Sequence, residues 1–166
     1  MPKVEAKIVP QESVKTQTPP AEPRVDERLM KPGKYEITDQ CTFVVDLHLV
    51  LKEGRWLIAN GPGRGIESHK ITFRMWGYDE MVGLRKMATS YDPVKRIHLT
   101  DNDVLNQLKV QKLLVSWTFD RDNPRLRLFH VGGTLTDESW GAFKKLQTNI
   151  SSQIIDEMNK VLEYNG

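Results

Sequence analysis

Hydrophobic and polar residues alternate with a period of two along "TFVVDLHLVL", residues 42–51. This period is typical of a strand that buries one of its faces. A turn containing Gly54 follows, and 56–60 resumes the strand pattern, so these runs predict a hairpin. Residues 70–76, "KITFRMW", alternate again. Three consecutive strands predict an antiparallel meander at 34–76.

The hydrophobic spacing becomes helical in 78–119, which predicts a helical part of two helices. The first is expected to end at Asp92, because a residue that precedes proline is pushed out of helical geometry. The second is expected to begin with Thr100 as its N-cap. The apolar stripe of the first helix comprises Met81, Leu84, Met87 and Ala88. That of the second comprises Val110, Leu113, Leu114 and Trp117.

The C-terminal third predicts a further helical part at 136–163, with Thr136 as N-cap. Its apolar residues recur every three or four positions, which fits one long amphipathic helix or two helices broken near 148–152. Residues 126–131 are compatible with one more strand, which Gly132 and Gly133 would end.

These elements predict an α+β fold for 34–166, a single domain with an antiparallel sheet of three to four strands packed against about three helices. Residues 1–33 differ in composition, since they hold six of the nine prolines and no aromatic residue. Such a segment has too little apolar surface for a core of its own. It is expected to be an extended arm, either a free tail or a segment that becomes ordered on a partner.

Composition narrows the classes of function. The chain has 24 basic and 22 acidic residues, a formal charge of +2, so no overall field draws it to nucleic acid or to an anionic membrane. Cys41 is the only cysteine, which excludes an internal disulfide and a multi-thiolate zinc site. No run approaches the roughly 18 to 20 apolar residues of a membrane span, and no secretory signal is apparent.

The glycine-rich stretch "GPGRG", residues 61–65, is a candidate phosphate loop. Phosphate-binding loops of this kind lead into a helix, whose N-terminus receives the anion. Here the pattern that follows is a strand, and the lysine and hydroxyl of a Walker motif are missing. We therefore expect a connector between two strands, in which the glycines adopt positive φ and Arg64 lies exposed at the tip. A small enzyme with its site in this loop is the weaker alternative.

No other pattern predicts catalysis, a cofactor or a metal site. The four histidines show no HxH or HxxxH spacing, and neither a serine nor a cysteine nucleophile motif is present. The protein is accordingly expected not to be an enzyme and not to bind a small molecule.

Aromatic and arginine side chains are enriched at the energetic centres of protein interfaces, and several here are candidates for contacting a partner. These residues are Trp56, Arg64, Arg74, Trp76, Phe129 and Trp140. Trp117 and Trp140 are equally compatible with the core, because both lie on helical stripes. The alternative from another class is a nucleic-acid surface, although acidic residues interleave with its cations. It would use Arg55, Arg64, Lys70, Arg74 and Arg127.

In 69–119, an "I-x-F-R" strand leads into a helix, and a capped acidic helix then ends in an aromatic residue. This order resembles the small tail and baseplate assembly proteins of contractile-tailed bacteriophages, and "LTDESWGAFKKLQTNISSQIIDEMNKVLE" is similar to their C-terminal helical part. The resemblance implies a virion structural protein or a tail-assembly protein, made in the host cytoplasm, that acts without catalysis. Its implied partners are other tail or baseplate proteins, such as the hub, the tube or the tape measure, with no membrane.

Overall fold

The computed structural model describes residues 33–163 of the chain. The chain divides into two units, Met1–Glu36 and Ile37–Gly166, and the second contains every helix and strand considered below. The expected arm at 1–33 lies outside the described residues apart from Gly33.

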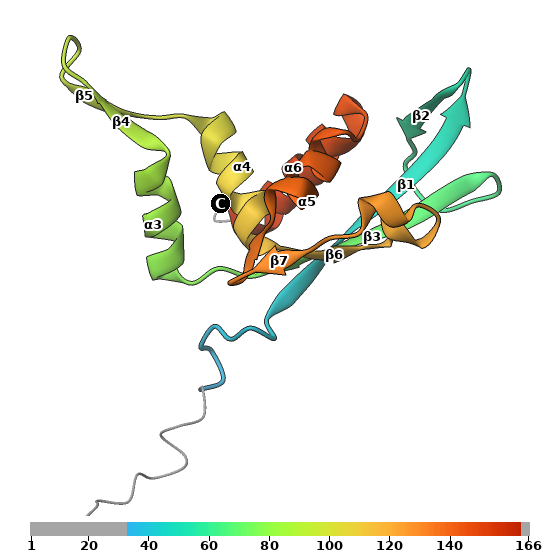
Figure 1. The fold of residues 1–166 in the computed structure, drawn as a ribbon, viewed down its shortest axis with the longest axis horizontal. Coiled ribbons are helices and arrows are strands. Elements are labelled where there is room, and N and C mark those ends of the chain that lie inside the picture. The colour runs from blue at the N-terminus through green and yellow to red at the C-terminus, as the bar shows by residue number, and fades with distance from the viewer. Residues whose placement is uncertain (1–32, 164–166) are drawn as a thin grey trace, which may run out of the picture. The chain divides into compact units, whose positions relative to one another are not determined.

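A four-stranded antiparallel sheet forms the centre of the second unit (Figure 1). Its strands are β1 (Thr42–Lys52), β2 (Arg55–Ile58), β3 (Ile66–Arg74) and β6 (Leu114–Trp117), in the order β2-β1-β3-β6. The meander of β1, β2 and β3 confirms the sequence prediction. The fourth strand, β6, comes from residues for which a helix was predicted.

The turn between β1 and β2 has two residues, Glu53 and Gly54, because Lys52 pairs with Arg55. Both turn residues have positive φ, 52° and 80°. Two positive φ values give the turn a twist that matches the right-handed twist of the flanking strands. Glycine takes this conformation without strain, whereas Glu53 holds it at a small steric cost.

Within residues 33–163 four helices accompany the sheet, so the α+β class is confirmed with one helix more than expected. They are α3 (Tyr78–Met87), α4 (Asn102–Leu113), α5 (Asp137–Lys144) and α6 (Thr148–Leu162). No helix in the described part of the chain is long and apolar enough to cross a membrane. The C-terminal part is two helices, as one of the two alternatives had it, and the break lies at 145–147.

The prediction of a purely helical part at 78–119 is wrong in its middle. A hairpin of β4 (Thr89–Asp92) and β5 (Ile97–Thr100) separates α3 from α4. The first helix ends at Met87, before the Asp92-Pro93 pair that was expected to end it. Asp92 instead shapes the hairpin turn, where its Oδ1 accepts the N–H groups of Val94 and Lys95.

Side-chain caps fix two helix starts. Asp101, not Thr100, caps α4, and its carboxylate accepts the N–H groups of Asp103 and Val104. Thr136 caps α5 as predicted by accepting the N–H of Ser139. Both side chains satisfy backbone donors that the first turn of a helix leaves unpaired.

The run 126–131 is only partly a strand. A short 3-10 turn, η4 (Pro124–Leu126), precedes it, and β7 (His130–Val131) pairs with β8 (Thr134–Leu135). Gly132 and Gly133 have positive φ and form the two-residue turn between these strands. The glycine pair therefore joins two short strands where the sequence suggested an end.

One face of the sheet builds the core. In β1 the alternate residues Val45, Leu47 and Leu49 are buried, and in β3 so are Ile71 and Phe73. The helices α4, α5 and α6 lie on this side of the sheet (Figure 1). Their contribution to the core includes Leu105, Val110, Leu113, Ala142, Phe143, Ile150, Ile154, Met158 and Leu162.

The glycine loop connects β2 to β3, which confirms that it is a strand connector. Of its three glycines only Gly65 has positive φ, 75°, so the expectation of positive φ holds for one position. The turn is closed by a hydrogen bond from the Ile66 N–H to the Gly63 carbonyl. Arg64 is exposed.

Replacing Gly65 with alanine is expected to lower the free energy of unfolding by about 1–2 kcal/mol, because an L side chain is strained at positive φ. Gly61→Ala is the matched control, since its backbone is not in that region and an added Cβ meets open space. It is expected to raise that free energy by up to about 1 kcal/mol or leave it unchanged. Chemical denaturation measures both; equal losses would contradict the assignment.

Trp76→Ala is expected to lower the free energy of unfolding by about 3–5 kcal/mol, because this indole is 7% exposed and belongs to the core. Tyr78→Ala, two residues away at an exposed position, is the control and should shift it by no more than about 0.5 kcal/mol. Thermal and urea denaturation test the pair, and a Trp76→Ala protein as stable as wild type would show that the indole is not part of the core.

Candidate functional site

The candidate site is the segment 78–104, which runs from α3 through the β4–β5 hairpin into α4. Within the described residues, it holds seven of the fifteen large hydrophobic side chains that are exposed. These seven are Tyr78, Met87, Tyr91, Val94, Ile97, Leu99 and Val104. Every residue from Pro93 to Val104 is exposed. Apolar groups on this scale, left exposed by the part of the chain that the structure describes, are typical of a surface that another molecule covers.

The base of the hairpin is fixed to both flanking helices. The Thr89 hydroxyl donates to the Arg85 carbonyl on α3 at 2.6 Å and lies 2.8 Å from the Thr100 hydroxyl across the strands. The Asp101 N–H donates to the Ala88 carbonyl at 2.8 Å, and Asp101 also caps α4. The hairpin is thus held at its root while the rest of it extends away from α3 and α4 (Figure 1).

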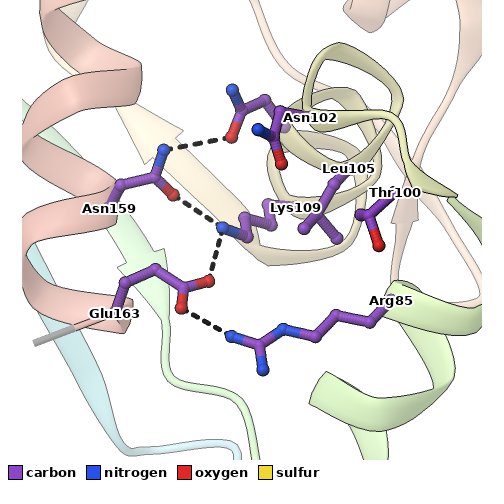
Figure 2. A pocket seen from close by; sticks show the side chains of 8 residues that line it. Arg85, Thr100, Asn102, Leu105, Lys109, Asn159 and Glu163 are labelled. Atoms are coloured by element: carbon purple, nitrogen blue, oxygen red, sulfur yellow. Dashed lines mark hydrogen bonds and ion pairs between the residues drawn. The ribbon is translucent and has the colours of Figure 1, made fainter. Parts of the chain in front are cut away.

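A polar cleft of about 550 Å³ lies beside this root, where α3, α4 and α6 meet. Figure 2 shows Asn159 and Glu163 directed at one amine, the Lys109 Nζ, while Arg85 of α3 is directed at the Glu163 carboxylate. The lining residues are Arg85, Thr100, Asn102, Leu105, Asn106, Lys109, Asn159 and Glu163.

Lys109 is 2% exposed, which is rare for a lysine and requires partners for its charge. Its Nζ donates to Asn159 Oδ1 at 2.8 Å and to Glu163 Oε1 at 2.7 Å. The ammonium also lies 5.2 Å from the centre of the Trp76 ring, within the range of a cation–π contact. Its interactions are made inside the fold, so the amine serves to join α4 to α6.

Two further contacts extend this network, one of them to α3 and the other between α6 and α4. Arg85 donates to Glu163 Oε2 at 2.6 Å, and Asn159 donates to Asn106 Oδ1 at 3.0 Å (Figure 2). Burial by itself would raise the pKa of the Glu163 carboxyl, but the hydrogen bonds and charges of Lys109 and Arg85 outweigh it and lower that pKa. The network holds the helices that carry the candidate site.

A second polar group surrounds His69 of β3. His69 Nε2 is 2.7 Å from Glu67 Oε1, and His69 Nδ1 is 2.8 Å from the Thr118 hydroxyl. That hydroxyl also accepts the Lys70 N–H at 3.1 Å, and the Phe119 ring packs on the imidazole. These contacts tie β3 to the 3-10 helix η3 (Thr118–Arg121). A nearby cleft of about 280 Å³ is lined mainly by apolar groups.

The six predicted partner-binding residues do not form one group. Trp76 is in the core, so it is not an accessible anchor, and Trp56 and Trp140 are partly buried against the core. Arg74 is half-buried: its bidentate pair with Glu80 raises its pKa. Of the six, Arg64 and Phe129 are exposed, and Arg127 lies over the Phe129 ring.

Sequence reasoning missed both the hairpin and Lys109. The signal for the hairpin was the alternation of polar and apolar residues in Ile97–Thr100 after the Asp92-Pro93 turn. The signal for Lys109 was its place between Leu105 and Leu113, four residues from each and on the same stripe of α4. A charged residue at such a position predicts a buried partner.

Comparisons of the chain with protein-family models, with curated proteins and with solved structures find no match. In the described part of the chain, no three or more histidine, cysteine, aspartate and glutamate side chains are placed to hold a metal ion.

Glu163 is expected to make the stability of the protein depend on pH. Its pKa is lowered in the folded state, so its contribution is present above the ordinary value of 4.5 and is lost as the pH falls through the folded value. Glu163→Gln should therefore be less stable than wild type at pH 7, and the difference should shrink below the ordinary value. Urea denaturation across this range measures it, and a difference that does not change with pH would contradict the ion pairs.

Proposed function

We propose that this protein is a non-enzymatic subunit of a multi-protein assembly and that it works through contacts with other proteins. The observation that supports this is the concentration of exposed large hydrophobic side chains in 78–104. Val94 is 89% exposed and Met87 is 65% exposed. A partner that covers such side chains removes their apolar area from water, which favours association by about 25 cal/mol per Å².

The finer proposal is a tail or baseplate subunit of a contractile-tailed bacteriophage, located in the virion and assembled in the host cytoplasm. It rests on the resemblance in 69–119 and in the C-terminal helical part. The segment 78–104 falls within the first of these regions. The partners would be other tail or baseplate proteins, and an N-terminal arm ordered on such a partner remains part of this proposal.

The nucleic-acid alternative loses support from the positions of its cations. Lys70 pairs with Asp46 at 2.8 Å, and Arg74 pairs with Glu80 at 2.7 Å. Two of the five basic residues assigned to that surface are thus engaged with carboxylates of the same fold. Binding to phosphates would have to break these pairs, which weakens the electrostatic term on which such binding depends.

Co-expression of the full chain, carrying a tag, with the products of the genes on either side of its own tests the proposal. The chain is expected to elute from a sizing column together with at least one of these proteins, at a mass above the 19.1 kDa of the chain alone. Reversing the position of the tag controls for contacts made by the tag. If the chain elutes separately from the co-expressed protein in every one of these experiments, the proposed function is contradicted.

A further inference from the structure

The β4–β5 hairpin has two different faces, and both are open. Its register pairs Ser90 with Leu99 and Asp92 with Ile97, which places both aliphatic side chains on one face. The other face carries the two threonines of the root and the Tyr91–His98 pair, whose ring centres lie 5.2 Å apart. A hairpin lying on its own domain would bury one of these faces, whereas here no residue of β5 is buried.

The turn of the hairpin is basic. Lys95 and Arg96 follow Pro93 and Val94, and neither forms an ion pair with any described residue. The carboxylate of Asp92, at the start of the turn, already accepts two N–H groups within it. The charges of Lys95 and Arg96 therefore face outward, beside the most exposed valine of the segment.

We propose that the β4–β5 hairpin, called the hairpin arm below, inserts into a groove on a second protein. The groove has apolar walls, and it carries carboxylates at the place that receives the turn of the hairpin. The inference rests on the proposed function and names the chemistry of the partner. The groove must have two walls because both faces of the ribbon are uncovered. It must be acidic because the turn presents two cations without partners among the described residues.

The root of the hairpin makes insertion favourable. A two-stranded ribbon alone is marginally stable in water, and ordering it on binding would cost free energy. Here hydrogen bonds from Thr89 and Asp101 hold the root to the ends of α3 and α4. The hairpin arm is therefore shaped before its partner arrives, so less conformational entropy is lost when it binds.

The probe for the test is the product of a neighbouring gene that the full chain retains in co-expression, purified and titrated by calorimetry. Ile97→Ser with Leu99→Ser should weaken binding about tenfold or more, because the apolar face then leaves the groove walls unfilled. Lys95→Glu with Arg96→Glu should weaken it about tenfold at low salt, and less at high salt where charges are screened.

Matched controls carry the same changes away from the hairpin arm. Val131→Ser with Val161→Ser alters two exposed aliphatic residues, and Lys144→Glu with Lys145→Glu reverses two adjacent exposed cations. Both should bind within about twofold of wild type. Circular dichroism and thermal unfolding confirm that each variant is folded, as expected for changes at exposed positions.

Four outcomes would overturn the inference. If a retained product binds both hairpin variants as tightly as it binds the wild-type chain, the proposed function still stands, but the hairpin is not the binding element. If the wild-type chain sediments as a dimer and the Ile97→Ser/Leu99→Ser variant as a monomer, the partner of the hairpin is a second copy of this chain. Binding of a short DNA duplex that Lys95→Glu/Arg96→Glu abolishes makes it nucleic acid. Retention of no product overturns the proposed function and the hairpin arm together.

Discussion

The β1–β3 pair buries one face under the helices, and the rest of the fold depends on this burial. Its register places Val45 opposite Ile71 and Phe43 opposite Phe73, so the apolar side chains of both strands point to the same side. A slip of one residue would turn Asp46 and Lys70 inward. Ile154 and Met158 of α6 and Val110 of α4 are fully buried and complete the core. Each such side chain contributes about 1.5–3 kcal/mol through its removal from water.

A different interaction orients the helices at the far side of the domain. Lys109 occupies a position on α4 where its neighbours Leu105 and Leu113 are apolar, and it brings a charge between α4 and α6. A buried charge has a narrower choice of geometry than a methyl group, because its partners must lie at hydrogen-bond distance. Glu163 meets this need and reaches Arg85 on α3 at the same time. The polar contacts of Glu163 thus connect α3 and α4 to the C-terminal end of α6.

The polar groups around Lys109 and His69 have their hydrogen-bond partners within the fold, whereas the apolar side chains of 78–104 remain exposed to water. The amine of Lys109 and the imidazole of His69 have partners within the domain, and among the described residues no buried side-chain nitrogen or oxygen lacks a hydrogen-bond partner. The apolar side chains of the hairpin, by contrast, are not buried by the described part of the fold. Among the described residues, the exposed apolar area of the hairpin is therefore left in contact with water, whereas the buried polar side-chain atoms all have partners.

Local patterns in the sequence were enough for the elements that bury one face. Alternation identified β1 and β3, helical spacing identified the buried stripe of Val110, Leu113 and Leu114, and glycine followed by a strand pattern identified the β2–β3 connector. The same spacing could not show that the chain turns from α4 into β6 at Leu114, because a buried residue looks alike in a helix and in a strand.

The hairpin and the burial of Lys109 could not be predicted from the sequence, for a related reason. A hairpin that buries neither face has only a short alternation to mark it, and the helical pattern on both sides masked it. The place of Lys109 depends on Glu163 and Asn159, which are 50 or more residues away along the chain. The sequence by itself determined which residues must leave water. Only the tertiary structure decided which of these residues are buried, because the segments that bury them are distant along the chain and come together only when it folds.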